Sequence, residues 1–325
     1  MFLLQSDIFV WDLLLLLLMT MTLSLAVVCA VWIKRNSGRL MQRTLIGLLG
    51  FFGFLGFFTI FYASFIEPKI IVVTEKTLSD PEAPKLRIAV VSDMHVGPYK
   101  GKDFVERAVQ RINQTMPDMV LMPGDFVFTH SARTEDLAPL AGIHAPMGVF
   151  AALGNHDLGE YLSLFGKRYT ALSGGDKVAS ALAEYGVTVL RNESKTIPVT
   201  EGTVVVAGID DMWTGHEDLG RALGDAPKSA YTILLSHNPS IADEPRSLDA
   251  HLIVSGHTHG GQLRLPWIGP LATLPTTLGQ SFDQGLFPMD ADTTLAITRG
   301  IGESTARTRL FAWPEILLIT LEGRE

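Results

Sequence analysis

The sequence has few cysteines and few basic residues, and both shortages exclude classes of protein. Its 325 residues include a single cysteine, Cys29, so no disulfide can form within the chain. From residue 69 onward there are 22 basic and 31 acidic side chains. Because affinity for nucleic acid comes largely from Lys and Arg on phosphates, we expect no nucleic-acid partner.

Several signatures of covalent and nucleotide chemistry are also missing. The sequence has no Gly-x-Ser-x-Gly elbow and no Gly-rich phosphate loop, and its cysteine lies far from the polar motifs described below. It has no internal repeat. A hydrolase built on this chain is therefore expected to use activated water as its nucleophile.

Two long apolar stretches stand near the N-terminus, at residues 13–33 and 45–66. Each can cross a bilayer core of about 30 Å, which needs roughly 20 residues. Basic residues follow the first stretch instead of preceding it, which argues against a cleaved signal peptide. Neither stretch has a polar face, which argues against a buried helical hairpin. We expect two transmembrane helices, with the phospholipid bilayer as a partner.

The charges around these stretches predict their orientation. The segment between the two spans is basic, with Lys34, Arg35, Arg39 and Arg43. The residues before the first span carry only the acidic side chains Asp7 and Asp12. The positive-inside rule places the basic turn in the cytoplasm, so the N-terminus and everything after the second span face outward. Trp11 and Trp32 flank the first span, as interfacial anchors do.

Five short polar motifs each follow an apolar run. They are Asp93-Met94-His95, Gly124-Asp125, Gly154-Asn155-His156-Asp157, His237-Asn238 and Gly256-His257-Thr258-His259-Gly260-Gly261-Gln262. Any one of them is compatible with an ordinary solvated turn. Two histidines one residue apart between glycines suit neither a helix nor a core. The five motifs together indicate a binding site.

The apolar runs before the motifs predict buried strands at residues 86–92, 119–123, 148–153, 231–236 and 252–255. Each candidate ligand then lies just past the C-terminal end of a strand. Sites gather there in sheets that are covered by helices. Helices are expected over residues 103–114 and 177–185.

The motifs supply two carboxylates, one carboxamide and several imidazoles. A catalytic zinc takes about three protein ligands and a water, so this set is too large for one ion. It suits two divalent ions roughly 3.5–4 Å apart that share a bridging carboxylate. Such mixed ligands suit Mn, Fe or Zn without selecting one of them.

The order Asp-x-His, Gly-Asp, Gly-Asn-His-Asp, His and Gly-His-x-His resembles that of the calcineurin-like metallophosphoesterases. Gly260-Gly261-Gln262, Arg299-Gly300-Ile301-Gly302 and Pro314-Glu315 resemble their bacterial membrane-anchored branch. Some members of that branch hydrolyse the pyrophosphate of UDP-2,3-diacylglucosamine in lipid A biosynthesis. The resemblance covers residues 85–321. It implies an α/β four-layer sandwich, with two facing sheets and helices outside, held in a bacterial inner membrane.

The resemblance also implies a role for each motif residue. Two groups of three residues would each hold one metal ion, and one carboxylate would bridge the ions: Asp93, His95 and His259; Asn155, His237 and His257; and Asp125. His156 would lie near the scissile phosphate, as a general acid for the leaving oxygen or as a charge stabiliser.

The chain departs from the protein-phosphatase subgroup at two points. Gly124-Asp125 is not followed by Asp-Arg-Gly, and Gly154-Asn155-His156 is followed by Asp157 where that subgroup has Glu. Both departures favour a phosphodiester or pyrophosphate substrate over a phosphoprotein.

Three further residues are candidates for substrate binding. Arg264 follows the last metal motif and would hold a phosphate or form a surface salt bridge. Asp210 follows the strand-like run 204–207 and would border the substrate or stand in a plain turn. Trp267 lies in the apolar segment 263–274, whose Pro and Gly residues prevent a regular helix. That segment is either a packed surface segment or a lip that touches the membrane or acyl chains.

These observations predict a membrane anchor over residues 1–68, a linker or incoming strand over 69–84 and a metallophosphoesterase domain over 85–325. The expected activity is hydrolysis of a phosphodiester or pyrophosphate by a metal-bridging hydroxide. Lipid substrates such as UDP-2,3-diacylglucosamine are among the candidates. The alternative is a catalytically silent membrane scaffold with the same fold, which would not need to retain every ligand.

Overall fold

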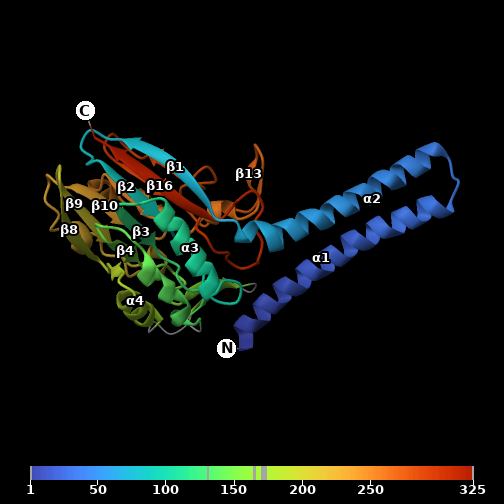
Figure 1. Ribbon diagram of the computed structural model, residues 1–325, viewed down its shortest axis with the longest axis horizontal. Helices are drawn as coiled ribbons and strands as arrows, with labels where there is room; N and C mark the ends of the chain where they lie inside the picture. The colour runs from blue at the N-terminus through green and yellow to red at the C-terminus, as the bar shows by residue number, and fades with distance from the viewer. Residues whose placement is uncertain (1, 130–131, 164–165, 170–173, 324–325) are drawn as a thin grey trace.

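The computed structural model describes residues 2–129, 132–163, 166–169 and 174–323. Two six-stranded sheets face each other, helices lie on their outer faces, and a pair of long helices projects to one side (Figure 1). This arrangement confirms the predicted α/β sandwich with two apolar helices before it.

The first sheet contains, in spatial order, β1 (Val72–Ser79), β16 (Glu315–Glu322), β2 (Leu86–Val90), β3 (Met119–Pro123), β4 (Val149–Ala152) and β7 (Thr188–Val189). Strands β2, β3, β4 and β7 run parallel to one another, and β16 is antiparallel to β2. The edge strand β1 pairs in parallel with β16 along its whole length.

The second sheet contains β14 (Gly285–Pro288), β15 (Thr294–Ile297), β11 (Leu252–Ser255), β10 (Tyr231–Leu235), β9 (Gly202–Gly208) and β8 (Glu193–Val199). Its four central strands are parallel, and both edge strands are antiparallel to their neighbours. Two small antiparallel pairs are β5 (Glu160–Ser163) with β6 (Gly166–Tyr169) and β12 (Arg264–Leu265) with β13 (Gly269–Pro270).

Alternation along the central strands builds two cores at once. In β2, Ile88 and Val90 pack between the sheets, where they join residues of the second sheet such as Ile233. Ala89 and Val91 point the other way, because successive side chains of a strand face opposite sides. There they pack with the helices α3 (Lys102–Gln114) and α4 (Gly174–Glu184). A third core lies between the second sheet and α5 (Leu219–Leu223).

The five strands and two helices predicted before and between the motifs all form, with ends shifted by at most a few residues. The range 69–84 contains β1, so the incoming-strand alternative describes it better than a linker does. The first sheet therefore begins before residue 85. Strand β1 can form there because β16, near the C-terminus, supplies the hydrogen-bond partners for its backbone.

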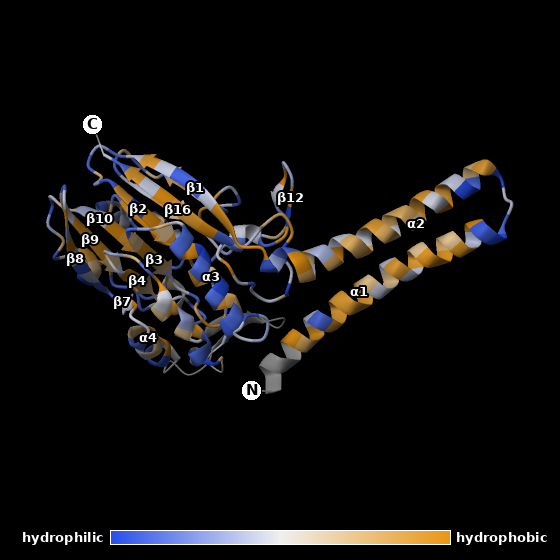
Figure 2. Ribbon diagram, in the orientation of Figure 1, coloured by the Kyte–Doolittle hydropathy of each residue, from blue (hydrophilic) through white to orange (hydrophobic). Residues whose placement is uncertain are grey.

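The projecting pair consists of α1 (Phe2–Arg35) and α2 (Leu40–Phe61), and the helical path continues as a π turn and a 3₁₀ turn to Lys69. Both helices are long and apolar enough to cross a membrane. Figure 2 shows them hydrophobic over most of their length and hydrophilic at the turn between them. A Cβ on Gly53 would lie 2.8 Å from the Thr22 carbonyl oxygen, so glycine lets the two backbones approach closely.

The base of the helical pair is fixed to the sandwich by polar contacts. The Trp313 indole donates to the Tyr62 hydroxyl at 3.2 Å, and the Arg309 amide donates to the Ala63 carbonyl at 2.8 Å. On the other helix, the Tyr99 hydroxyl donates to the Asp12 carboxylate at 3.3 Å. The helices and the sandwich thus have a defined orientation relative to each other.

Candidate metal centre

The loops that leave the C-terminal ends of five parallel strands converge on one edge of the sandwich. Three of them follow β2, β3 and β4 in the first sheet, and two follow β10 and β11 in the second. Seven predicted ligands come from these loops, and all are at least nine-tenths buried: Asp93, His95, Asp125, Asn155, His237, His257 and His259. The topology therefore brings the five motifs together, as their positions after the strands predicted.

The first cluster consists of Asp93, His95 and His259. His95 Nε2 lies 3.2 Å from His259 Nε2, and His259 Nε2 lies 3.3 Å from Asp93 Oδ1. Two imidazole nitrogens and a carboxylate oxygen therefore point at one small volume. A cation at that point would satisfy all three lone pairs.

The second cluster consists of Asp125, His237 and His257. His237 Nε2 lies 3.1 Å from Asp125 Oδ2 and 3.1 Å from His257 Nδ1. The same Asp125 Oδ2 lies 3.5 Å from His95 Nε2 in the first cluster. One carboxylate oxygen therefore stands between the two clusters, in the position that a bridging ligand requires.

The ligand backbones are held in an uncommon conformation. Asp93, His95 and Asp125 have φ values of 51°, 46° and 56°, and His257 and His259 have values of 68° and 52°. Non-glycine residues seldom adopt positive φ, and surrounding structure has to enforce it. Neighbouring glycine is one such condition, because a Cβ on Gly154 would lie 2.2 Å from Asp125 Oδ1. The loops are shaped for the site at a cost in local stability.

Three of the four histidines are in the protonation state that metal ligation requires. Burial lowers the pKa values of His95 and His257 well below the usual range and that of His259 to about 4, so these imidazoles are neutral. Burial acts on His237 too, but the Asp125 carboxylate outweighs it and raises the pKa of His237 well above its usual value. A cation at the second cluster would therefore have to displace a proton from His237.

The chemistry of the donor atoms supports the same assignment. The donor set of carboxylates, an amide and imidazoles is the one that divalent transition metals accept. The residues present therefore fit two divalent ions, whose identity the donor set does not fix.

Asp157 organises the loops beneath the ligands. Its carboxylate accepts hydrogen bonds from the backbone amides of Asp125, Phe126, Val127 and Gly154 at 2.9–3.1 Å. It thereby ties the loop after β3 to the loop after β4. The sequence motif contains this residue, but nothing local to the motif indicates that it binds backbone amides.

His156 lies at the rim of the same centre. Its ring centroid is 4.5 Å from that of His95, and its Nδ1 is 2.7 Å from the Phe128 carbonyl oxygen. Because a carbonyl only accepts, Nδ1 carries a proton and donates it to the Phe128 carbonyl. The backbone amide of His156 also donates to Asp125 Oδ1 at 2.9 Å, which fixes the residue relative to the bridging carboxylate.

A pocket of about 430 Å³ opens over the metal centre. Its wall includes the ligands Asp125, Asn155, His257 and His259 together with His156. The remaining lining is largely apolar and includes Trp11 of α1, Trp213, Leu263 and Leu274. The Trp213 ring packs edge-on against His257, with centroids 4.4 Å apart.

The sequence pointed to Trp11 only as an interfacial anchor and gave no indication of Trp213. Trp213 follows β9, which pairs in parallel with β10. This pairing places Trp213 at the same edge of the sheet as the residues that follow β10.

The three predicted substrate-binding residues lie elsewhere. Among the described residues that line the metal pocket, none is Arg264, Asp210 or Trp267. Arg264 pairs with the Asp283 carboxylate, and Asp210 forms a bidentate salt bridge with Arg191 at 2.8–3.2 Å. Trp267 is fully exposed on the β12–β13 hairpin. The charges of Arg264 and Asp210 are thus neutralised by partners that sequence order does not reveal.

Arg309 is a buried residue that sequence reasoning missed. Its guanidinium donates to the carbonyl oxygens of Arg299 and Ala312 at 2.9 and 2.7 Å, and to that of Gly302. One of its nitrogens lies 3.3 Å from His259 Nδ1. Arg309 thus holds the loop behind a metal ligand, and no local motif marks it.

Comparisons with known proteins agree with this geometry. The family model described as calcineurin-like phosphoesterase matches residues 86–261. The uncharacterized metallophosphoesterase YkuE of Bacillus subtilis is 28% identical over 298 residues, which cover 89% of this chain and 99% of that protein. UDP-2,3-diacylglucosamine pyrophosphatase LpxG of Chlamydia trachomatis is 27% identical and covers 79% of this chain and 91% of its own.

A vertebrate relative is also similar to this chain. It is named a transmembrane protein with metallophosphoesterase domain, comes from Danio rerio and is 31% identical over 269 residues. The match covers 78% of this chain and 57% of that protein.

Proposed function

Because this chain belongs to the calcineurin-like phosphoesterase family, whose members hydrolyse phosphoester bonds, we propose that it is a membrane-anchored hydrolase of phosphodiester or pyrophosphate bonds with two divalent ions. The observation that carries the proposal is the position of Asp125 Oδ2, between a histidine of each cluster at 3.5 and 3.1 Å. One ion would be held by Asp93, His95 and His259, and the other by Asn155, His237 and His257.

The chain's own residues define the rest of the chemistry. When bound, the ions would supply an activated water and neutralise charge on the phosphate. Asp125 holds the two metal positions together, and His156 presents a ring nitrogen near them for the leaving oxygen. The apolar wall of the pocket limits access of bulk water.

The substrate class is proposed from the pocket and from the relatives. The absence of the protein-phosphatase residues after Gly124-Asp125 favours a diester or an anhydride. LpxG, which carries the name of a UDP-2,3-diacylglucosamine pyrophosphatase, matches most of this chain. A lipid pyrophosphate is therefore the first lipid substrate to try.

Hydrolysis of bis-p-nitrophenyl phosphate by the purified full chain tests the proposal. We expect turnover that disappears with EDTA and returns with Mn²⁺, because ions in this site would supply the activated water. The controls are p-nitrophenyl phosphate, a monoester, and UDP-2,3-diacylglucosamine in detergent. A protein that binds two ions per chain and hydrolyses none of the three would instead be the silent scaffold.

We further propose that the catalytic domain faces outward, to the periplasm or the cell exterior. The turn between α1 and α2 and the helix ends beside it carry Lys34, Arg35, Arg39 and Arg43, and the positive-inside rule places them in the cytoplasm. Nucleotide-linked precursors of lipid A are expected at the cytoplasmic face. An outward domain would therefore act on another phosphoester of the cell envelope.

Reporter fusions test this orientation. Alkaline phosphatase is active only outside the cytoplasm, so a fusion after Glu325 should be active and a fusion after Ser37 should be silent. A cytoplasmic reporter at the same two positions should give the opposite pattern and serves as the control. Activity of alkaline phosphatase at Ser37 alone would place the domain inside and favour the nucleotide-linked lipid.

A further inference from the structure

The β12–β13 hairpin, residues 263–271, exposes a group of apolar side chains. Trp267 is fully exposed, and Ile268 and Leu271 are 71% and 55% exposed. Among the described residues beyond residue 69, eight large apolar side chains are exposed. Six of them lie on this hairpin or on Phe311 beside it. An exposed apolar cluster of this kind marks an interaction surface.

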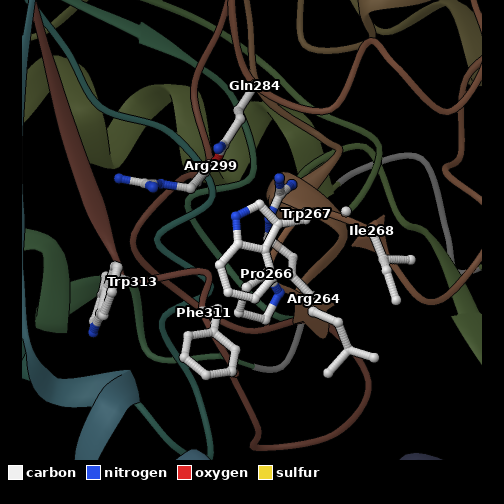
Figure 3. Close-up of a pocket in the computed structure, with 10 residues that line it drawn as sticks. Arg264, Pro266, Trp267, Ile268, Gln284, Arg299, Phe311 and Trp313 are labelled. Atoms are coloured by element: carbon white, nitrogen blue, oxygen red, sulfur yellow. The ribbon is translucent and has the colours of Figure 1, made fainter.

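The hairpin is not a packed surface segment. On one side it borders a cavity of about 510 Å³, around which Figure 3 shows the side chains of Trp267, Phe311 and Trp313. On the other side, Leu263 lines the metal pocket. Within the apolar segment 263–274 only the last residue, Leu274, is buried, and it lines the metal pocket. The segment thus has a buried end and an exposed tip.

The hairpin also has a fixed position relative to the apolar helices. Its first strand bonds to the neighbouring loop through the Arg264 amide and the Leu310 carbonyl at 2.9 Å. That same loop bonds to the end of α2 through Arg309 and Trp313. Figure 1 shows the hairpin beside the end of α2 that meets the sandwich. A membrane that contains α1 and α2 would therefore begin close to the hairpin tip.

The metal pocket opens at the same level. Trp11 of α1 forms part of its wall, and it lies inside the candidate span Ile8–Arg35, two residues before the apolar stretch 13–33. Two residues correspond to about 3 Å along a helix axis. The headgroup layer on each side of the hydrocarbon core is about 5–7 Å thick. In a membrane that contains both helices, the part of the pocket wall formed by Trp11 would therefore lie at the headgroup layer.

We propose that the β12–β13 hairpin inserts its tip into the membrane leaflet on the sandwich side of α1 and α2, and that the metal pocket receives a lipid which stays in that leaflet. The occupant is the bilayer itself, because the exposed apolar side chains of the hairpin lie beside the end of the apolar helix α2. The scissile phosphate is then the one next to the acyl-bearing part, within the headgroup layer. The second half of this proposal rests on the proposed phosphoesterase function, whereas the insertion does not.

A depth measurement tests the insertion without any turnover. In full-length protein with Cys29→Ser, a spin label at Ile268→Cys in phosphatidylethanolamine–phosphatidylglycerol nanodiscs should be accessible to oxygen and protected from a water-soluble nickel chelate. The matched control is Met116→Cys, which replaces an apolar residue that is 76% exposed after α3. Its label should show the reverse pattern. Equal nickel accessibility at both positions would overturn the insertion.

A pair of substrates with the same leaving group tests the lipid path. Hexadecyl p-nitrophenyl phosphate in nanodiscs has an acyl-like chain, and bis-p-nitrophenyl phosphate has none. The double variant Ile268→Ser, Leu271→Ser should lower the ratio of kcat/KM for the hexadecyl ester to kcat/KM for bis-p-nitrophenyl phosphate at least about tenfold. The reason is that burial of each large apolar side chain in the bilayer supplies roughly that factor or more. Met116→Ser should leave the ratio as it is.

The outcomes separate this proposal from the proposed function. An equal loss on both substrates in the double variant would mean that the hairpin supports the fold and not a lipid. If neither substrate is hydrolysed by the unaltered chain, the phosphoesterase function fails. The depth measurement then still decides whether the hairpin enters the membrane.

Discussion

Asp125→Asn is expected to lower kcat on bis-p-nitrophenyl phosphate by at least roughly 10³-fold. Removal of a single charge-stabilising group from an active site already costs about 10²–10³-fold, and this carboxylate stands between both metal clusters. The exchange is nearly isosteric. In the unaltered chain the backbone amide of His156 donates to Asp125 Oδ1 at 2.9 Å, and Asn keeps an oxygen that can accept this hydrogen bond. The variant should therefore fold, and its circular dichroism should match that of the unaltered chain.

Metal content gives a second measurement on the same variant. One negative charge shared by two divalent ions is lost, so elemental analysis should show fewer than two ions per chain at limiting metal. Asp225→Asn removes the same charge from an exposed position and should change neither turnover nor metal content. Near-normal turnover with two bound ions in Asp125→Asn would refute the bridging assignment.

The position of the metal ligands could be predicted from sequence because local pattern determines it. A short apolar run closed by a polar residue forms a strand followed by a loop, and the C-terminal ends of parallel strands share one edge. Asp93 after β2 and His237 after β10 meet for this reason, although they come from different sheets. Which ligand binds which ion came from the family resemblance and awaits measurement.

Residues whose role depends on distant partners could not be predicted. Asp210 follows a strand like the metal ligands, yet Arg191 from the start of a different loop neutralises it. Arg264 looked available for a phosphate until the fold placed Asp283 beside it. Such pairings depend on how loops pack, and periodicity carries no information about that.

The presence of Trp11, a residue of α1, in the pocket wall also depends on contacts between distant residues. Trp11 resembles any interfacial tryptophan in sequence, but the contact between Tyr99 and Asp12 holds its helix against the catalytic loops. The strand β1 required β16, more than two hundred residues away, before it could be recognised as part of a sheet. Both features depend on contacts between residues far apart in the chain, whereas the sequence pattern gives information only about local structure.

His156→Ala should keep both metal ions and lose about 10²–10⁴-fold in kcat, the range typical of a general acid or base. The Phe128 carbonyl, 2.7 Å from Nδ1, fixes the ring, and the second ring nitrogen is the one that could deliver a proton to the leaving oxygen. Elemental analysis and kcat on the same sample separate the two functions. His144→Ala, which removes an exposed imidazole, is the control and should leave both values unchanged.

The choice of leaving group distinguishes the two roles proposed for His156. A p-nitrophenolate leaves readily without a proton, whereas an alkoxide needs one, so a general acid matters more for the alkyl diester. If His156 protonates the leaving oxygen, the loss in His156→Ala should be larger for a dialkyl phosphate than for bis-p-nitrophenyl phosphate. Added imidazole should restore part of the lost rate, because it can supply the missing proton. Equal losses on both diesters with both ions retained would assign His156 to charge stabilisation. Loss of an ion would make it a metal ligand, since its ring lies within ligand distance of the His95 and Asp125 cluster.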